Sequence, residues 1–384
     1  FCSHWWGEAV LDFVACCEKH AELRRLSQAE ASYWVCAYAN RQHELGLEIN
    51  VPLESCSFAK ALKEAKGVLL FLDPTATAMT RMWCNFELYN TLSDSSTILD
   101  IVTVPQNRTE DGDRRPLLLT EGLLPRETTD GKRRREQNFP MGLLATGMRA
   151  KLEEGKATKI DDKERILKHM AKQFQKGGLN YETALELALE QANSALNATF
   201  AQAAWGKAVR MQTVCDFDPE SPGTLSLPDI LVKDEQRKIF MLNLSHLDEV
   251  NDTELQSVAR GLPPNLQQLG LCFESCNNIS DVGVRELMVV IGSRRSLRHM
   301  HLDFLGCKGI SDAGVRAVAK HLPESVIDLR LDFAKCTKIT AVGAMYLANH
   351  LESLKLQKCV LTLRGTKVNQ NFASKTEIMT RFKG

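Results

Sequence analysis

The chain has 384 residues, which is enough for two or three domains of ordinary size. Apolar residues make up 44% of it and charged residues 25%, as in a typical soluble globular protein. The formal net charge is zero, so no whole-molecule field attracts nucleic acid or an anionic membrane, and we expect neither as a partner. No apolar stretch approaches the ~20 residues that a membrane-spanning helix needs.

The twelve cysteines favour a reducing compartment. None belongs to a CxxC pair, and several lie inside apolar runs such as Val14-Ala-Cys-Cys17. Thiols used as small buried apolar groups are typical of intracellular proteins rather than of disulfide-stapled secreted ones. We therefore expect a cytoplasmic location. The chain opens at Phe1, without Met, in a strand-like segment, so we also expect it to be a fragment of a longer protein.

Residues 1–104 alternate between strand-like and helical patterns. Continuous apolar runs, such as Val68–Asp73, are typical of strands buried in a parallel sheet. The alternation predicts a doubly wound parallel sheet with helices between its strands. The predicted helices are Leu11–His20, Ser57–Lys66 and Thr80–Leu92, and the predicted strands are Tyr33–Ala37, Val68–Asp73 and Thr97–Val104.

Three motifs in this region resemble Toll/interleukin-1-receptor (TIR) domains. Phe1-Cys-Ser3-His-Trp-Trp-Gly7-Glu8 resembles the opening box of that family, with Trp6 where the family has a basic residue. Gly46–Ile49 followed by Phe58–Leu62 looks like the loop and helix after its second strand. Trp83-Cys84-Asn-Phe-Glu87-Leu88 is similar to its Trp-Cys-x-x-Glu-Leu helix. The resemblance implies a flavodoxin-like sheet in residues 1–104, within an α/β domain that we place at residues 1–150.

The resemblance to TIR domains implies one of two activities. The first is self-association through TIR–TIR contacts, and the second is hydrolysis of NAD at the nicotinamide–ribose bond. NAD would then be a substrate, and no cofactor is required. The implied site consists of a catalytic Glu87 and four NAD-binding residues, Ser3, His4, Gly7 and Trp83.

A carboxylate at position 87 suits this chemistry for a physical reason. Breaking an N-glycosidic bond builds positive charge on the ribose, which a placed carboxylate stabilises. We expect Glu87 at the rim of a cleft at the carboxyl ends of the strands, lined by Phe1–Glu8 and Asn40–Ile49. The alternative is that Glu87 is an ordinary surface residue of a helix, with Trp83 and Cys84 packed in the core.

The middle of the chain predicts a loop and then helices. Residues 105–140 are rich in Arg, Asp, Gly, Pro and Thr and lack periodicity, which predicts a long loop. Within it Lys132–Arg135 is basic, but neighbouring acidic residues favour a solvated segment over a nucleic-acid site. Residues 151–214 carry Leu, Ala and Ile at helical spacing. Three prolines and a glycine near 215–228 mark a boundary, so we place a linker at 215–235 and the last domain at 236–384.

Three segments in the last third of the chain share one pattern of Leu-x-Leu, Cys, Ile and Gly. The Leu-x-Leu pair predicts a short strand with alternate side chains on one face, and the Gly-containing part predicts a returning helix. One such unit cannot bury its own apolar face, so units stack. The three segments are Leu266–Gly283, Leu297–Gly314 and Val326–Gly343, with a weaker copy at Ile239–Asp252 and a truncated one at Leu351–Cys359.

This pattern resembles the cysteine-containing leucine-rich repeats and implies an α/β solenoid over about residues 236–364. Side chains between the leucines should then point outward from the inner sheet, where a polar, charged face suits a protein partner. The predicted partner-binding residues are His299, His301, Asp303, Asp328, Arg330 and Asp332. The same reasoning assigns Asn243 and Ser245 in the first repeat, and Ser353, Lys355 and Gln357 in the last, to this face.

A metal site on this face is the less favoured interpretation. His299 and His301 beside Asp303 would need a further fixed ligand and supporting hydrogen bonds. The repeated cysteines likewise suit the turn of each repeat better than metal ligation, so we expect no metal.

The sequence thus predicts a cytoplasmic signalling or recognition protein, α/β throughout, with a helical middle segment. Its repeats would bind a protein partner, and its TIR-like domain would act by self-association or by NAD hydrolysis. One alternative is a non-catalytic interaction scaffold. Another is a ubiquitin-ligase substrate adaptor, because similar repeats occur in such adaptors, although no F-box-like segment stands out before the repeats.

Overall fold

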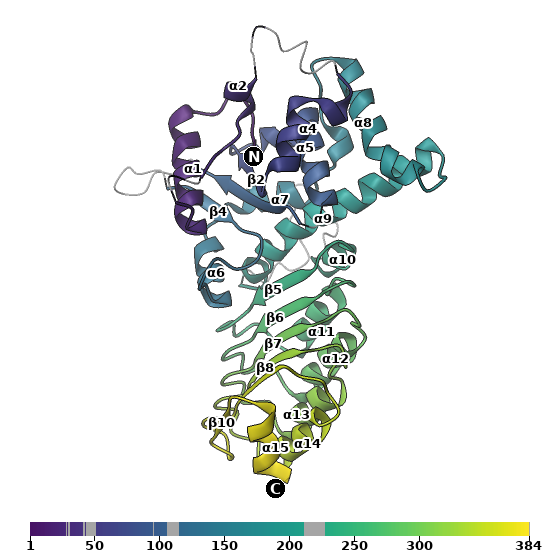
Figure 1. The fold of residues 1–384 in the computed structure, drawn as a ribbon. Helices are drawn as coiled ribbons and strands as arrows, with labels where there is room; N and C mark the ends of the chain where they lie inside the picture. Colours follow the sequence, from purple (N-terminus) through teal and green to yellow (C-terminus); the bar gives the residue numbers. More distant parts are fainter. Residues whose placement is uncertain are drawn as a thin grey trace. The chain divides into compact units, whose positions relative to one another are not determined.

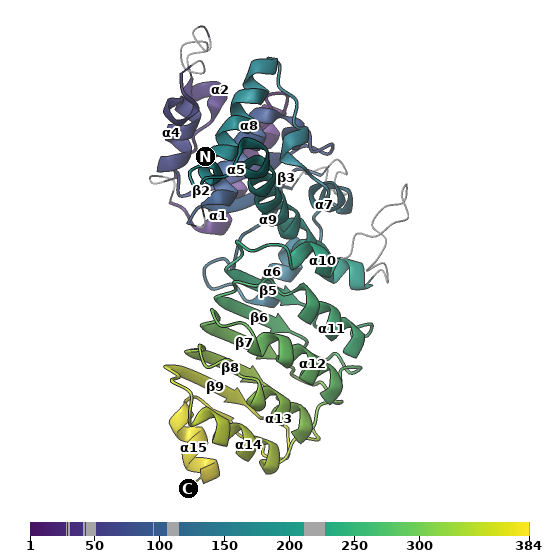
Figure 2. The ribbon, with the colours of Figure 1, turned by 90° about the vertical axis from the view of Figure 1, so that its right-hand side faces the viewer.

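The computed structural model describes residues 1–27, 29, 31–40, 43, 51–94, 96–105, 115–210 and 227–383 (Figures 1 and 2). It is a mixed α/β structure with two sheets in which most strands are parallel, which confirms the α/β class. The chain divides into two compact units, Phe1–Ala203 and Ala204–Gly384. The division falls inside α9 (Tyr181–Arg210), and the first part of the predicted linker at 215–235 lies outside the described residues.

The first unit contains a four-stranded sheet in the order β1-β2-β3-β4. Three strands are parallel, as the alternation of patterns predicts: β1 (Cys2–Ser3), β2 (Gly67–Leu72) and β3 (Ile98–Thr103). Leu69, Phe71 and Val102 pack with Cys16 on one face of the sheet, and α5 contacts the strands as well. The helices of this unit are α1 (Val10–Arg24), α2 (Cys36–Ala39), α4 (Ser57–Glu64), α5 (Met82–Ser93), α6 (Thr129–Glu136), α7 (Met141–Met148), α8 (Ile160–Gln175) and most of α9.

Two predictions for this unit are wrong. The expected strand at Tyr33–Ala37 is reduced to one bridge between Cys2 and Val35, because α2 begins at Cys36. The expected long loop at 105–140 contains β4 (Leu117–Leu119), which pairs antiparallel with β3, and also α6. α6 has no apolar stripe, so helical periodicity could not reveal it. Its charged side chains are instead paired with one another and with β4, as described below.

The second unit contains a six-stranded sheet whose neighbouring strands follow the chain order (Figure 2). Five strands are parallel: β5 (Ile239–Asn243), β6 (Gln268–Cys272), β7 (His299–Asp303), β8 (Asp328–Asp332) and β9 (Lys358–Thr362). β10 (Asn371–Phe372) pairs antiparallel with β9. Helices alternate with the strands and pack on one another in order: α10 (Leu227–Leu231), α11 (Asp252–Gly261), α12 (Asp281–Gly292), α13 (Asp312–Lys320), α14 (Ala341–Leu351) and α15 (Lys375–Lys383).

The repeated cysteines each bond to the preceding repeat. The thiols of Cys276, Cys307 and Cys336 donate hydrogen bonds of 3.1 Å to the carbonyl oxygens of Leu244, Phe273 and Phe304. All three cysteines are fully buried. Each is therefore a small, packed, hydrogen-bonded group, which explains why a larger or charged residue does not suit this position.

A ladder of aspartates, which we call the Asp ladder, joins successive helices. Asp252 accepts hydrogen bonds from the backbone and hydroxyl of Ser280, and Asp281 does the same for Ser311. Asp312 accepts them from Thr340. A side chain at the repeated glycine has no room, because a Cβ at each would lie 2.4–2.6 Å from a carboxylate oxygen of the ladder; these glycines are Gly283, Gly314 and Gly343.

The register of the two outermost repeats differs from the sequence prediction. In the last repeat, Lys358, Val360 and Thr362 occupy the positions assigned to Ser353, Lys355 and Gln357. In the first, Met241 and Asn243 align with Gly270 and Cys272, so Ser245 lies beyond the strand. Leu351, Leu354 and Leu356 imitate the strand spacing, but Leu351 ends α14, and the strand leucine is Leu361.

Candidate functional site

Ser3, His4 and Glu87 lie together in the first unit, where β1 ends beside α5. Ser3 pairs with Leu70 across β1 and β2, so the chain leaves the carboxyl end of β1 at His4. The thiol of Cys84 on α5 donates to the carbonyl oxygen of His4 at 3.5 Å. The Ser3 hydroxyl lies near the Glu87 carboxyl and affects its pKa. The structure therefore brings together the side chains of two of the five residues that the TIR resemblance implies, Ser3 and Glu87, and the backbone of a third, His4.

Glu87 lies in the protein interior, with 3% of its surface exposed, and not on an exposed rim as predicted. The reason is the position of α5, which contacts β1 and β3 on one side and α8 and the short helix η3 (Leu152–Glu154) on the other. Residues 84–89 of α5 are consequently all buried. A helix covered on both sides has no solvent face, which the sequence did not indicate.

Burial determines the charge of this site. It raises the pKa of Glu87 to about 8, while the Ser3 hydroxyl acts in the opposite direction. Burial lowers the pKa of His4, so the imidazole is neutral at pH 7 and the Glu87 carboxyl is mostly protonated. Nearby, burial and the charges of Asp73 and Asp12 raise the pKa of Glu8 to about 8. The sequence analysis included Glu8 only in the Phe1–Glu8 lining and did not name it as a site residue, although it directly follows Gly7.

Two buried polar atoms of this site, Ser3 Oγ and Glu87 Oε2, lack a hydrogen-bond partner of normal geometry among the described residues. His4 Nδ1 is unpaired as well, but the His4 ring packs against Phe13 of α1 and against Phe71, with centroids 5.0 and 6.3 Å apart. Most buried polar atoms in proteins are paired, so two neighbouring unpaired ones call for an explanation. A hydroxyl and a carboxyl offer donors and acceptors for the hydroxyl groups of a sugar.

Gly7 and Trp83, the other two residues that the resemblance implies, are held by packing contacts of their own. Gly7 is exposed, and a Cβ there would lie 2.4 Å from the Trp5 ring, so the packing of Trp5 requires glycine. The Trp83 ring stacks on Phe58 with 5.2 Å between centroids, and its indole N–H donates to Asp162 at 3.3 Å. Trp83 thus joins α4, α5 and α8 as a packing residue. The expected Asn40–Ile49 lining lies almost wholly outside the described residues.

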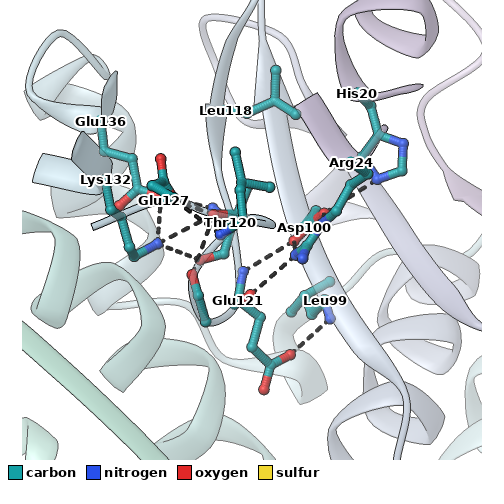
Figure 3. Close-up of polar contacts among 12 residues, drawn as sticks. His20, Arg24, Leu99, Asp100, Leu118, Thr120, Glu121, Glu127, Lys132 and Glu136 are labelled. Carbon is teal, nitrogen blue, oxygen red and sulfur yellow. Dashed lines mark hydrogen bonds and ion pairs between the residues drawn. The ribbon is translucent and has the colours of Figure 1, made fainter. Parts of the chain in front are cut away.

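A polar network surrounds Asp100 and was not predicted from the sequence (Figure 3). Arg24 donates to both Asp100 oxygens, at 2.8 and 2.6 Å, and His20 lies 3.1 Å away. The backbone N–H of Glu121 donates to the same carboxylate at 3.0 Å. Burial alone would raise the pKa of Asp100, but the hydrogen bonds from His20 and Arg24 lower it overall. This network attaches α1 and the end of β4 to β3, so we assign it a structural role.

A second network explains the basic segment predicted as a solvated loop. Lys132 of α6 forms an ion pair with Glu136 at 2.5 Å, and Arg135 reaches Glu127 at 2.9 Å. Glu136 also accepts a hydrogen bond from the backbone N–H of Thr120, next to β4 (Figure 3). Lys132 and Arg135 are therefore committed to intramolecular contacts. The solvated interpretation is wrong for these two residues.

The six predicted partner-binding residues lie on one face of the second sheet. β7 and β8 align His299 with Asp328, His301 with Arg330, and Asp303 with Asp332. The intervening Met300, Leu302, Leu329 and Leu331 are buried. The strand alternation therefore holds all six on the face opposite the leucines.

The charges on this face are paired only loosely. Arg330 is 58% exposed at its side chain and lies 3.8 Å from Asp328, while His299 is 50% exposed and lies 3.9 Å from the same carboxylate. Burial lowers the pKa of His301 and raises that of Asp332, so these two side chains are less solvated than His299 and Arg330. Asp303 and Asp332 accept hydrogen bonds from the backbone N–H groups of Leu305 and Ala334 at 2.9 and 2.8 Å. The exposed, weakly paired Arg330 and His299 leave hydrogen-bonding capacity for another molecule.

Comparison with known proteins adds no assignment to either site. No protein-family model matches the chain, and neither does any curated protein. Within the described ranges, no three His, Cys, Asp or Glu side chains are grouped so as to hold a metal ion. The helices described also include none that is both long and apolar enough to cross a bilayer.

Proposed function

We propose that the second unit is a leucine-rich-repeat solenoid that binds a protein partner through the exposed face of its sheet. Support for the repeat class comes from the parallel strands in chain order, the alternating helices and the hydrogen-bonded turn cysteines. The observation that carries the binding proposal is the alignment of His299, His301 and Asp303 with Asp328, Arg330 and Asp332 on one solvent-facing surface. We propose a cytoplasmic setting for this role.

The experiment is comparative capture from cell extract with quantitative mass spectrometry. The 384-residue chain is compared with Arg330→Glu/His299→Glu and with a control, Glu286→Lys, on the helix side of the same unit. The Glu286 side chain is 44% exposed and pairs with its neighbour Arg285. A partner should be retained by the control and lost from the double variant. Equal capture by all three proteins would place binding elsewhere and would favour the scaffold or adaptor alternatives.

We further propose NAD hydrolysis as a second candidate function, centred on Glu87 of a TIR-like first unit. The specific observation in its favour is the pair of unpaired buried atoms on Ser3 and Glu87, which lie close together. In this mechanism Ser3 binds a ribose hydroxyl, and the ionised Glu87 stabilises the positive charge that develops on the sugar. Because burial raises the pKa of Glu87 to about 8, activity should increase with pH around that value.

The test is nicotinamide release by purified protein at high concentration, across pH 6 to 9 (roughly two units around the cited pKa). Wild-type protein and a control, Glu164→Gln on the exposed surface of α8, should consume NAD. Glu87→Gln should not, because the amide cannot carry the charge. Wild-type protein that never consumes NAD even when assembled would remove the enzymatic proposal and leave self-association as the role of this unit.

A further inference from the structure

A groove of about 480 Å³ runs along the first half of α9 and shares no residue with either site above. Three apolar side chains line it: Tyr181, Leu185 and Leu189. Glu182, Glu186 and Glu190 line it as well, and all three are exposed. The groove therefore combines an apolar part with an acidic border.

The three glutamates form a straight stripe, which we call the Glu stripe. Residues four apart in a helix lie on the same face, about 6 Å from one another along the axis. The lining from Tyr181 to Asn193 thus spans about 18 Å of α9, or roughly three helical turns. A groove of this length and openness suits an extended or helical chain better than a compact small molecule, which favours enclosed pockets.

The wall of the groove outside α9 consists of Glu153, and it is held in place. Asn193 accepts a hydrogen bond from the backbone N–H of Leu152 and donates one to Glu153, both at 2.9 Å. One turn later, Asn197 donates to the carbonyl oxygens of Gly147 and Ala150 at 2.8 and 3.0 Å. The wall is consequently ordered before any partner arrives, which reduces the entropy lost on binding.

The Glu stripe has no cationic partner among the residues that the structure describes. The ion pairs on the neighbouring α8 join Arg165 to Asp162 and Lys168 to Glu164, and they do not extend to Glu182, Glu186 or Glu190. Like charges four residues apart destabilise a helix slightly, and Glu153 adds a fourth carboxylate to the lining of the groove. Charge complementarity therefore favours a basic ligand.

We propose that this groove binds an amphipathic helix of a partner protein. Lys or Arg side chains spaced four residues apart on that helix would face the Glu stripe, and its apolar side chains would pack on Tyr181, Leu185 and Leu189. This surface is independent of the sheet face in the second unit, so the two can bind different partners.

The test uses the full chain and a fluorescent synthetic peptide of about five helical turns. The peptide carries Lys every fourth residue on one face, Leu on the adjacent face, and Ala and Gln elsewhere. Fluorescence anisotropy should show saturable binding that weakens with salt. Glu186→Lys/Glu190→Lys should weaken it at least tenfold. Glu164→Lys/Glu286→Lys, which makes the same change in net charge on other exposed surfaces, should bind like the wild type.

Two further peptides distinguish binding in the groove from attraction by charge alone. Replacing the Leu residues by Ser while keeping every Lys should weaken binding at least tenfold, because the apolar contact is lost. Replacing the Lys residues by Glu should restore binding to Glu186→Lys/Glu190→Lys and not to the wild type. Equal binding of the Leu and Ser peptides, or equal binding by the two double variants, would overturn the proposal.

Discussion

The two units of this protein satisfy their buried polar groups in different ways. In the second unit one solution is repeated, since the bonds of the Asp ladder and of the turn cysteines each occur three times in successive repeats. In the first unit each solution occurs once, as in the contacts that Asp100 makes with Arg24 and His20. A repeated solution spreads stability over many equivalent bonds, whereas a single network concentrates it in one carboxylate.

The largest effect should follow from removing that carboxylate. Asp100→Ala leaves the Arg24 guanidinium partly buried without its charge partner, and we expect a loss of about 3 kcal/mol in the free energy of unfolding. Urea unfolding followed by tryptophan fluorescence measures it, because four of the five tryptophans lie in the first unit. Asp161→Ala, on the exposed side of α8, is the control. An equal, small loss for both variants would contradict the structural role of Asp100.

The same network predicts a pH dependence. Its hydrogen bonds lower the pKa of Asp100 below the ordinary value of 3.8. The folded state therefore binds this proton less readily than the unfolded state, and the stabilisation is present above that pH and lost as the pH falls further. Asp100→Asn should lack this acid-dependent loss.

The Glu87 carboxyl should give the opposite pH dependence of stability. Its folded pKa of about 8 exceeds the ordinary 4.5, so the folded state holds a proton that the unfolded state releases between these values. Stability contributed by this group is full below pH 4.5 and falls as pH rises toward 8. Glu87→Gln should therefore stabilise the first unit at pH 8, on the order of 2–3 kcal/mol, and leave it unchanged at pH 4.5. Destabilisation by this substitution at pH 8 would show that the carboxylate is paired.

A substitution that breaks one bond of the Asp ladder should lower the free energy of unfolding by a smaller amount. Ser311→Ala removes the hydroxyl bond to Asp281 and the cap on the Ala313 N–H, but Asp281 keeps backbone bonds from residues 311 and 314. We expect a loss of about 1 kcal/mol. Hydrogen exchange should increase mainly at the junction of α12 and α13. Exchange that increases only in the first unit would refute this assignment.

Substitution on the exposed face of the sheet should have the smallest effect on stability. Arg330→Glu should change the free energy of unfolding by less than about 0.5 kcal/mol, since the side chain is 58% exposed and its ion pair is long. The thermal midpoint of the full chain measures this. A large drop would mean that Arg330 supports the fold and is not free to contact a partner.

The comparison of the units also explains what could be predicted from the sequence. The central repeats were placed in register because Leu-x-Leu, Cys and Gly recur at matching distances around Leu302 and Leu331. The predicted register of the last repeat was wrong, because three leucines near the end of α14 have the same spacing as the strand leucines. The Asp100 network could not be predicted, because Arg24 lies 76 residues away in the sequence and only the fold brings the two together.

The candidate site in the first unit was predicted in part for a similar reason. The TIR-like motifs assigned Ser3 and Glu87 to one site, and Ser3 at the end of β1 does lie near Glu87 of α5. They could not show that α8 covers α5 and buries Glu87, because burial depends on a segment that lies far along the chain. The sequence analysis therefore identified the residues of this group but not its electrostatic state.

The Asp ladder also bears on how such a chain can change its length during evolution. Every internal unit both supplies an aspartate and presents a serine or threonine to the one before it, so a duplicated unit inserted in the middle would find both of its connections ready. Deletion of one unit would likewise leave matching ends. The ladder closes at Ala341, which stands where Asp252, Asp281 and Asp312 stand in earlier units and needs no successor. Gain or loss of whole units between residues 252 and 341 would therefore preserve the bonds of the ladder, whereas insertion of part of a unit would break them.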